Sequence, residues 1–372
     1  MLLVEAARRL QLVADQFEGA CLSRLGGDEF ALLVPEVTLP EMRWVCAGLL
    51  NRLRQPVSFG SADLEVGISI GLVMLDADRH GVDDALRDGD LATHAAKAAG
   101  KNHWTLFVPA MHEDLVARLT LEGELAVALE EDQLDVHYQP QVRLADLRTV
   151  GVEALVRWNH PTRGLVPPDE FIVASERGPL IHALGAWVLR AACQQLVAWS
   201  AQLGPDAPCE VAVNVSPRQL LDPRFVDTVA QVLAETGLDP ERLVLEITES
   251  TAMGPNSREQ LLALRATGVR LAIDDFGTGH SSLSRLALLP VDTLKIDQSF
   301  VQAIPATGDA PLVRAMIAMA HSLDLSVVAE GIETERQRDY LTGLGCEHGQ
   351  GYLFSRPLPA AEMAGLLRGV AA

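Results

Sequence analysis

From about Met111 onward, short apolar runs alternate with amphipathic stretches long enough for helices. Strands that alternate with helices predict βαβ units and a parallel sheet. About eight such units over roughly 250 residues predict an α/β fold of the TIM-like (β/α)₈ barrel type. The predicted strands are Leu134–Tyr138, Val150–Val156, Glu210–Val215, Leu243–Ile247, Val269–Ile273, Thr293–Ile296, Leu325–Ala329 and a weaker one near Gly351–Phe354.

The first hundred residues follow a different order of helix, hairpin, helix, strand and helix. Leu22 to Val34 is predicted to form two strands around Gly26-Gly27, because a glycine pair favours a tight hairpin turn. A helix over Val82–Ala99 is predicted to end at Gly100. We therefore predict a partial α+β domain over residues 1–110 and a barrel over residues 111–372.

Polar side chains stand at or near the C-terminal ends of six predicted strands, the end that carries the active site in barrel enzymes. One buried acid is usually structural, but several converging acids would repel one another and lose hydration. Divalent cations would relieve this repulsion, and oxygen ligands suit Mg²⁺ or Mn²⁺ better than zinc. The candidates are Glu153, Asn214, Glu246, Asp274, Asp275, Lys295, Asp297 and Glu330.

The net charge of −20 argues against a nucleic-acid polymer as partner, because phosphate neutralisation needs surplus Lys and Arg. No membrane segment is expected, since the apolar run Gly178–Leu189 is shorter than the ~18 residues of a span. The N-terminus lacks the pattern of a signal peptide. Five scattered cysteines match neither a disulfide framework nor a zinc site, which predicts a cytoplasmic location.

The string Glu153-Ala154-Leu155-Val156-Arg157-Trp158 resembles the signature of the EAL family, phosphodiesterases that hydrolyse cyclic di-GMP. The resemblance extends from Met111 to the end of the chain. It continues through Tyr138-Gln139-Pro140, Asn214-Val215-Ser216, Glu246-Ile247-Thr248-Glu249, Asp274-Asp275-Phe276-Gly277-Thr278-Gly279, Lys295-Ile296-Asp297, Glu330-Gly331-Ile332-Glu333 and Gln350-Gly351-Tyr352.

The resemblance implies a two-metal hydrolysis of cyclic di-GMP to linear pGpG, with two Mg²⁺ or Mn²⁺ ions per active site. Glu153, Asn214, Glu246 and Asp274 would hold one ion, and Asp274 would bridge to the second. Asp275 and Glu330 would hold the second ion together with Asp274. Lys295 would orient the nucleophile or stabilise charge on the phosphate, so that Lys295, Glu330 and Glu153 are the predicted catalytic residues.

Other positions are assigned roles by the same resemblance. Gln139 and Arg157 resemble phosphate or guanine contacts, and an Arg fork suits phosphate. Glu249 resembles the family's loop-anchoring glutamate, which supports Asp274-Asp275. Asp297, Glu333 and Gln350 would complete the substrate pocket, and a homodimer of two EAL domains is implied. The departures from the family pattern are His280, Gln298 and Pro179, none of them a predicted ligand.

The first segment resembles a GGDEF domain, the nucleotidyl-cyclase palm-like family of diguanylate cyclases. Arg24-Leu25-Gly26-Gly27-Asp28-Glu29-Phe30 carries the hairpin signature, and Asp28 resembles a metal ligand. The family's first metal-binding Asp and its strand are absent, and Phe17 and Ala20 replace the family's inhibitory Arg and Asp. We therefore expect an N-terminally truncated remnant with a structural or regulatory role.

Two further functions compete with hydrolysis. A catalytically silent domain of this family would bind cyclic di-GMP as a receptor, but such domains usually lose a metal ligand, and every ligand position is filled here. Synthesis of cyclic di-GMP is disfavoured by the missing first metal-binding Asp. The sequence therefore predicts a cyclic-guanylate-specific phosphodiesterase, with the receptor module as the alternative.

Overall fold

The computed structural model describes residues 2–59, 62–64, 66–75, 81–254, 257–279, 283–305 and 309–369. The chain divides into two compact units, Met1–Arg118 and Leu119–Ala372. Helix α4 (Ala110–Glu130) contributes residues to both units. The predicted boundary between residues 110 and 111 coincides with the start of this helix.

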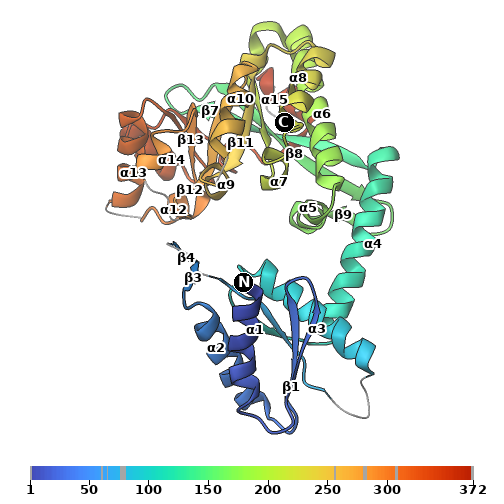
Figure 1. Ribbon diagram of the computed structural model, residues 1–372. Helices are drawn as coiled ribbons and strands as arrows, with labels where there is room; N and C mark the ends of the chain where they lie inside the picture. Colours follow the sequence, from blue (N-terminus) through green and yellow to red (C-terminus); the bar gives the residue numbers. More distant parts are fainter. Residues whose placement is uncertain are drawn as a thin grey trace. The chain divides into compact units, whose positions relative to one another are not determined.

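The N-terminal unit is a small α+β domain, drawn in blue in Figure 1. Strands β1 and β2 pair antiparallel with Gly26 opposite Glu29, and Gly27 has a φ of +49°, which confirms the predicted hairpin. Helix α3 packs on the parallel pair β5–β6, while α1 packs on α2. The elements are α1 (Leu2–Ala14), β1 (Cys21–Gly26), β2 (Glu29–Leu33), α2 (Leu39–Leu53), β3 (Val57–Phe59), β4 (Ala62–Leu64), β5 (Ile70–Leu72), α3 (Val82–Ala98) and β6 (Trp104–Leu106).

The C-terminal unit is a closed eight-stranded barrel, as the sequence predicted. Six neighbouring pairs from β8 round to β15 are parallel, and β7 closes the ring between β8 and β15. The barrel strands are β7 (Leu134–Arg143), β8 (Thr149–His160), β10 (Glu210–Asn214), β11 (Leu243–Thr248), β12 (Arg270–Phe276), β13 (Thr293–Ile296), β14 (Ser326–Ala329) and β15 (His348–Gly349).

Strand β7 runs antiparallel to both of its neighbours, which departs from the predicted all-parallel barrel. Only residues 144–148 join β7 to β8. A connection this short suits an antiparallel pair, because a parallel crossover needs a dozen or more residues. Strand β8 also continues well beyond Glu153, because its far end pairs with β9 (Gly164–Val166).

The last barrel strand lies earlier than predicted, at His348–Gly349 instead of Gly351–Phe354. Residues 351–354 form a turn. Gly351 sits so close to the chain at Ile332 that an added Cβ would lie 2.2 Å from the Ile332 carbonyl oxygen. The short strand β16 (Leu358–Pro359) then pairs with β7.

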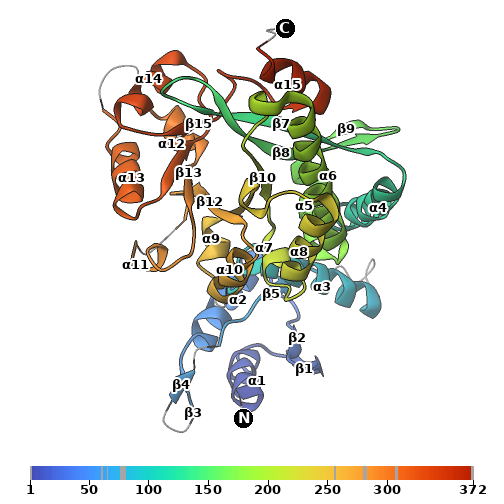
Figure 2. The same cartoon turned by 90° about the horizontal axis from the view of Figure 1, so that it is seen from above.

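Helices surround the strands of this unit, with α13 on one side and α6 and α8 on the other (Figure 2). The remaining short elements are the 3₁₀ turns Gly204–Asp206 and Pro240–Arg242. The helices are α5 (Pro168–Arg177), α6 (Leu180–Leu203), α7 (Pro217–Leu220), α8 (Phe225–Thr236), α9 (Glu249–Ala252), α10 (Ser257–Ala266), α11 (Leu283–Leu286), α12 (Gln298–Gln302), α13 (Pro311–Ser322), α14 (Glu335–Gly343) and α15 (Ala360–Leu367).

Helix α6 packs one face against the barrel strands, although the stretch Leu180–Asp206, which joins this helix to the following 3₁₀ turn, is long and apolar enough to cross a membrane by length and composition. That stretch is longer than the apolar run Gly178–Leu189 noted in the sequence. Its buried face includes Leu196 and Trp199, and the Trp199 ring meets the Tyr138 ring of β7 edge-on at 4.8 Å. This packing is typical of a core helix.

The C-terminal half of α4 is anchored by one fully buried leucine, Leu125. We expect Leu125→Ala to lower the free energy of unfolding by about 2–5 kcal/mol, because it opens a cavity in the barrel core. Val127, in the same helix, is 47% exposed. The control Val127→Ala should stay within about 0.5 kcal/mol of the wild type. Urea titration followed by circular dichroism measures both, and equal effects would contradict the packing described for α4.

Candidate active site

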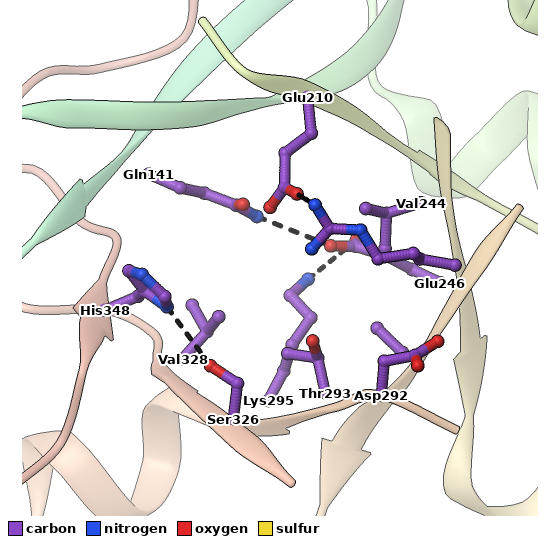
Figure 3. Close-up of a pocket in the computed structure, with 12 residues that line it drawn as sticks. Gln141, Glu210, Val244, Glu246, Asp292, Thr293, Lys295, Ser326, Val328 and His348 are labelled. Carbon is purple, nitrogen blue, oxygen red and sulfur yellow. Dashed lines mark hydrogen bonds and ion pairs between the residues drawn. The ribbon is translucent and has the colours of Figure 1, made fainter. Parts of the chain in front are cut away.

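A cluster of carboxylates surrounds one ammonium group inside the barrel. Lys295, on β13, is 1% exposed, so its Nζ lies away from solvent. Nζ donates to Glu246 Oε2 of β11 at 2.7 Å, a pair visible in Figure 3. Nζ also lies 2.6 Å from Glu330 Oε1, 3.1 Å from Asp274 Oδ1 and 3.8 Å from Glu153 Oε2. The structure thus brings together four predicted acids and the predicted catalytic lysine.

The charges in this cluster do not balance. Burial by itself would lower the pKa of Lys295, but the four surrounding carboxylates outweigh burial and hold that pKa well above its usual value. Burial raises the pKa of Glu246 well above its usual value and that of Glu330 to about 8, although Lys295 opposes both shifts. The site therefore holds more acid groups than one ammonium neutralises.

Asp274 and Asp275 both reach the cluster, although they are neighbours on β12. Consecutive side chains of a regular strand point to opposite faces. Here the register of β12 against β13 shifts between Ile273 and Phe276, and Asp275 has a left-handed φ of +53°. As a result, carboxylate oxygens of Asp274, Asp275 and Glu330 lie within 4.8 Å of one another. Burial, followed by the charge of Asp274, raises the pKa of Asp275.

Two amide groups hold the Glu153 carboxylate of β8. Asn214, the last residue of β10, donates from Nδ2 to Glu153 Oε1 at 2.7 Å. Gln350, just after β15, donates from Nε2 to Glu153 Oε2 at 2.5 Å. Because its Nδ2 is engaged, the oxygen of Asn214 is the atom that could bind a cation.

Gln139, Gln141 and Gln350 form a chain of amides along one wall of the barrel. Gln350 Nε2 donates to Gln139 Oε1 at 3.0 Å, and Gln139 Nε2 donates to the Ser355 carbonyl at 3.1 Å. Gln141 Nε2 donates to Gln350 Oε1 at 3.1 Å and reaches Glu246 Oε1 at 3.5 Å. The side chains of Gln139 and Gln350, both predicted substrate contacts, are thus bound to other protein groups.

Glu249 lies just behind the β12 acids, at the start of α9. It is 3% exposed, and its Oε2 accepts the Gly277 N–H at 2.8 Å. A Cβ added to Gly279 would lie 2.7 Å from Glu249 Oε1, so the carboxylate packs tightly against this turn. The hydrogen bond and this packing therefore hold the turn at residues 277–279, directly after Asp274 and Asp275, in place. His280, a predicted departure from the family pattern, lies outside the described residues.

The remaining predicted residues lie around this cluster rather than in it. Arg157 is half-buried, and its Nη1 donates to the Val156 carbonyl at 2.9 Å. Asp297 caps α12 and accepts the Ser299 N–H at 3.0 Å. Glu333 is exposed. Within the described part of the chain, neither Arg157 nor Glu333 forms a hydrogen bond or ion pair with the cluster acids.

The donor set of this cluster fits hard divalent cations. Its candidate ligands are carboxylate oxygens, Glu246 is 2% exposed, and four carboxyl groups surround the single Lys295 ammonium. Carboxylates in a largely dry site suit Mg²⁺ or Mn²⁺. Asp274, Asp275 and Glu330 already approach closely enough to share one cation, and Asp274 and Glu330 face the Lys295 ammonium together with Glu246 and Glu153.

Gln141 is the site residue that the sequence analysis did not single out. It stands two positions after Gln139 on β7, and alternate residues of a strand share one face. Once Gln139 is placed in the barrel interior, the same alternation places Gln141 there. The signal was therefore present in the string Tyr138-Gln139-Pro140-Gln141.

Comparison with known proteins agrees with this architecture. Residues 122–357 match the EAL domain family, and residues 1–103 match the diguanylate cyclase, GGDEF domain family. The chain is 38% identical over 366 residues to the bifunctional diguanylate cyclase/cyclic di-GMP phosphodiesterase MucR of Pseudomonas aeruginosa, covering 98% of this chain and 53% of MucR. It is 41% identical over 350 residues to the cyclic di-GMP phosphodiesterase NbdA of the same organism, covering 93% of this chain and 44% of NbdA.

A solved structure of the PaMucR phosphodiesterase, a c-di-GMP complex, resembles the C-terminal unit. The two share 43% sequence identity with a TM-score of 0.62, over 66% of this chain and 99% of that chain. The present chain spans about half the length of the curated relatives MucR and NbdA. Because the EAL match alone extends over more than half of its residues, this chain belongs to the EAL domain family, with a GGDEF segment ahead of the barrel.

Proposed function

We propose that this chain hydrolyses cyclic di-GMP to linear pGpG at the carboxylate cluster of its barrel. The observation that carries the proposal is the convergence of acids from β8, β11, β12 and the residue directly after β14 on the buried Lys295. The substrate is supported by relatives named as cyclic di-GMP phosphodiesterases and by the cyclic di-GMP complex of PaMucR.

Two divalent cations, Mg²⁺ or Mn²⁺, are part of the proposal. We assign Glu153, Asn214, Glu246 and Asp274 to one ion, and Asp274, Asp275 and Glu330 to the other. When bound, such ions supply stabilisation of phosphodiester charge and a nucleophilic water of lowered pKa. The close approach of Asp274, Asp275 and Glu330 supports the second set, and the shared environment of Glu153 and Glu246 supports the first.

Hydrolysis forms one bond from a water oxygen to phosphorus and breaks the bond from phosphorus to O3′. The product keeps a 5′-phosphate on one guanosine and gains a 3′-hydroxyl on the other, which is linear pGpG. Lys295 stabilises charge on the attacked phosphate or orients the water, because its ammonium is buried and protonated. Arg157, Asp297 and Glu333 line the substrate side, while Gln350 acts indirectly by holding Glu153.

A first prediction concerns Glu153, which is bound by Asn214 and Gln350. We expect Glu153→Gln to reduce hydrolysis by more than about a hundredfold, since ligand loss removes several kcal/mol of charge stabilisation. Glu210→Gln is the matched control, because Glu210 is also largely buried but pairs with Arg270 at the opposite end of the barrel. Chromatographic assay of pGpG, with circular dichroism of both variants, measures the result. Near-wild-type turnover of Glu153→Gln would contradict the assignment.

A second prediction separates hydrolysis from silent binding of cyclic di-GMP. EDTA should abolish pGpG formation by the wild-type chain, and added Mg²⁺ or Mn²⁺ should restore it. Ca²⁺ should restore it poorly, because its longer and looser coordination fits closely spaced carboxylates badly. Product formation in excess EDTA would rule out the cation-dependent mechanism. Ligand binding without turnover in any of these ions would favour the receptor module.

A third prediction concerns Asp28 and Glu29 on the exposed hairpin of the N-terminal unit. No group of three acidic, histidine or cysteine ligands within the described ranges includes either residue. We therefore expect no cyclic di-GMP from GTP and Mg²⁺, measured by mass spectrometry. The double variant Asp28→Ala/Glu29→Ala should hydrolyse cyclic di-GMP within about twofold of the wild type. If the wild-type chain makes cyclic di-GMP from GTP and the double variant does not, this prediction is wrong.

A further inference from the structure

A polar cavity lies next to the carboxylate cluster, and the proposed mechanism assigns no role to it. A cavity of about 80 Å³ lies at the end of the barrel where the parallel strands begin, below Glu246 and Lys295 (Figure 3). It is large enough for a few water molecules. Its polar lining comes from the first residues of several strands and from their flanks, including Glu210, Arg270, Asp292, Ser326 and His348.

Gln141 lies beside the cluster residues Glu246 and Lys295 in the lining of this cavity. It lines the cavity and is 5% exposed, and in Figure 3 its amide nitrogen points toward the Glu246 carboxylate. That nitrogen lies 3.5 Å from Glu246 Oε1 and 3.1 Å from Gln350 Oε1. The Gln141 amide therefore contacts Glu246 directly. It also contacts the Gln350 amide, which in turn donates to Glu153.

Glu246 has its two oxygens held from different sides. Lys295 binds Oε2 at 2.7 Å, and Gln141 is the donor that faces Oε1. A carboxylate that is bound at one oxygen only can rotate about its last torsion, which is broad for sp³–sp² bonds. Without the Gln141 donor, Oε1 would face the polar cavity and could turn toward water there.

Gln350 depends on Gln141 for the orientation of its amide. Its Nε2 donates to Glu153 Oε2 and Gln139 Oε1, which requires its Oε1 to point the other way, toward the Gln141 donor. If the Gln350 amide were reversed, its oxygen would face the Glu153 carboxylate, and two acceptors would meet. The Gln141 N–H thus selects the orientation in which Gln350 holds Glu153.

We propose that Gln141 is a positioning residue that fixes the carboxylates of Glu246 and, through Gln350, Glu153 for binding a divalent cation. This inference rests on the proposed function, because it concerns the same acids. Gln141 acts on the ligands and not on the substrate. Outer-shell partners that orient metal ligands are typically worth about 10- to 100-fold in metal affinity.

The test measures Mn²⁺ binding to the full chain by isothermal titration calorimetry. Gln141→Leu removes both amide donors with little change in volume, and we expect its Kd for Mn²⁺ to rise about 10- to 100-fold. Ser326→Ala is the matched control, because Ser326 lines the same cavity but contacts His348 at 3.3 Å rather than a cluster acid. Its Kd should equal that of the wild type.

A double-variant cycle distinguishes positioning from a general loss of packing. Gln350→Leu should also weaken Mn²⁺ binding, and Gln141→Leu/Gln350→Leu should weaken it by less than the product of the two single effects, since both act on Glu153. At saturating Mn²⁺ the hydrolysis rate of Gln141→Leu should return to within about threefold of the wild type. Gln141→Met, with its flexible unbranched chain, provides the same comparison if the leucine variant does not fold.

The outcomes distinguish this inference from the function on which it rests. If the wild type binds Mn²⁺ and forms pGpG while a folded Gln141→Leu or Gln141→Met variant binds Mn²⁺ equally well, the positioning role is wrong and the function stands. If the wild type neither binds Mn²⁺ nor forms pGpG, the proposed function fails, and the positioning role fails with it. A raised Kd in Ser326→Ala equal to that in Gln141→Leu would also overturn the inference.

Discussion

Negative charge confined in a dry barrel is the constraint on which the other features of the C-terminal unit depend. Glu153, Glu246 and Asp274 approach one buried ammonium from three strands, and Glu330 approaches it from just after a fourth. Desolvation of each acid opposes folding, and one unit of positive charge offsets only part of that penalty. Lys295 therefore links neighbouring strands at the centre of the barrel. The acid groups that Lys295 does not neutralise are the feature that fits the proposed divalent cations.

The groups that surround these acids are mostly amides, and this choice has an electrostatic reason. Asn214 and Gln350 donate hydrogen bonds to Glu153, and Gln141 approaches Glu246. An amide fixes the direction of a carboxylate without cancelling its charge. A second lysine or arginine in the same place would satisfy the acids and compete with cations. The amide wall thus preserves the negative potential while removing conformational freedom.

The sequence predicted the barrel and the acids at its strand ends because both follow from alternation of apolar and polar positions. Strand direction does not follow from that pattern, so the antiparallel β7 became visible only in the structure. The two-residue strand His348–Gly349 contains no β-branched or apolar residue that would predict a strand. The apolar residues near Leu353 resemble a strand pattern, although they form a turn. Contacts such as Gln141 to Gln350 join positions 209 residues apart, and spacing along the chain cannot reveal them.

The irregularity of β12 has a consequence for the geometry of the site. Asp274 and Asp275 lie on the same side only because the register shifts and the backbone at Asp275 turns left-handed. Their Cα atoms are joined by one trans peptide, which fixes the separation of consecutive Cα atoms at about 3.8 Å. Covalent structure therefore sets the offset between the two Cα atoms, while the backbone turn at Asp275 and the side-chain torsions set how close the two carboxylates come. A regular extended backbone at Asp275 would turn one of the two carboxylates to the other face of the strand and separate the pair.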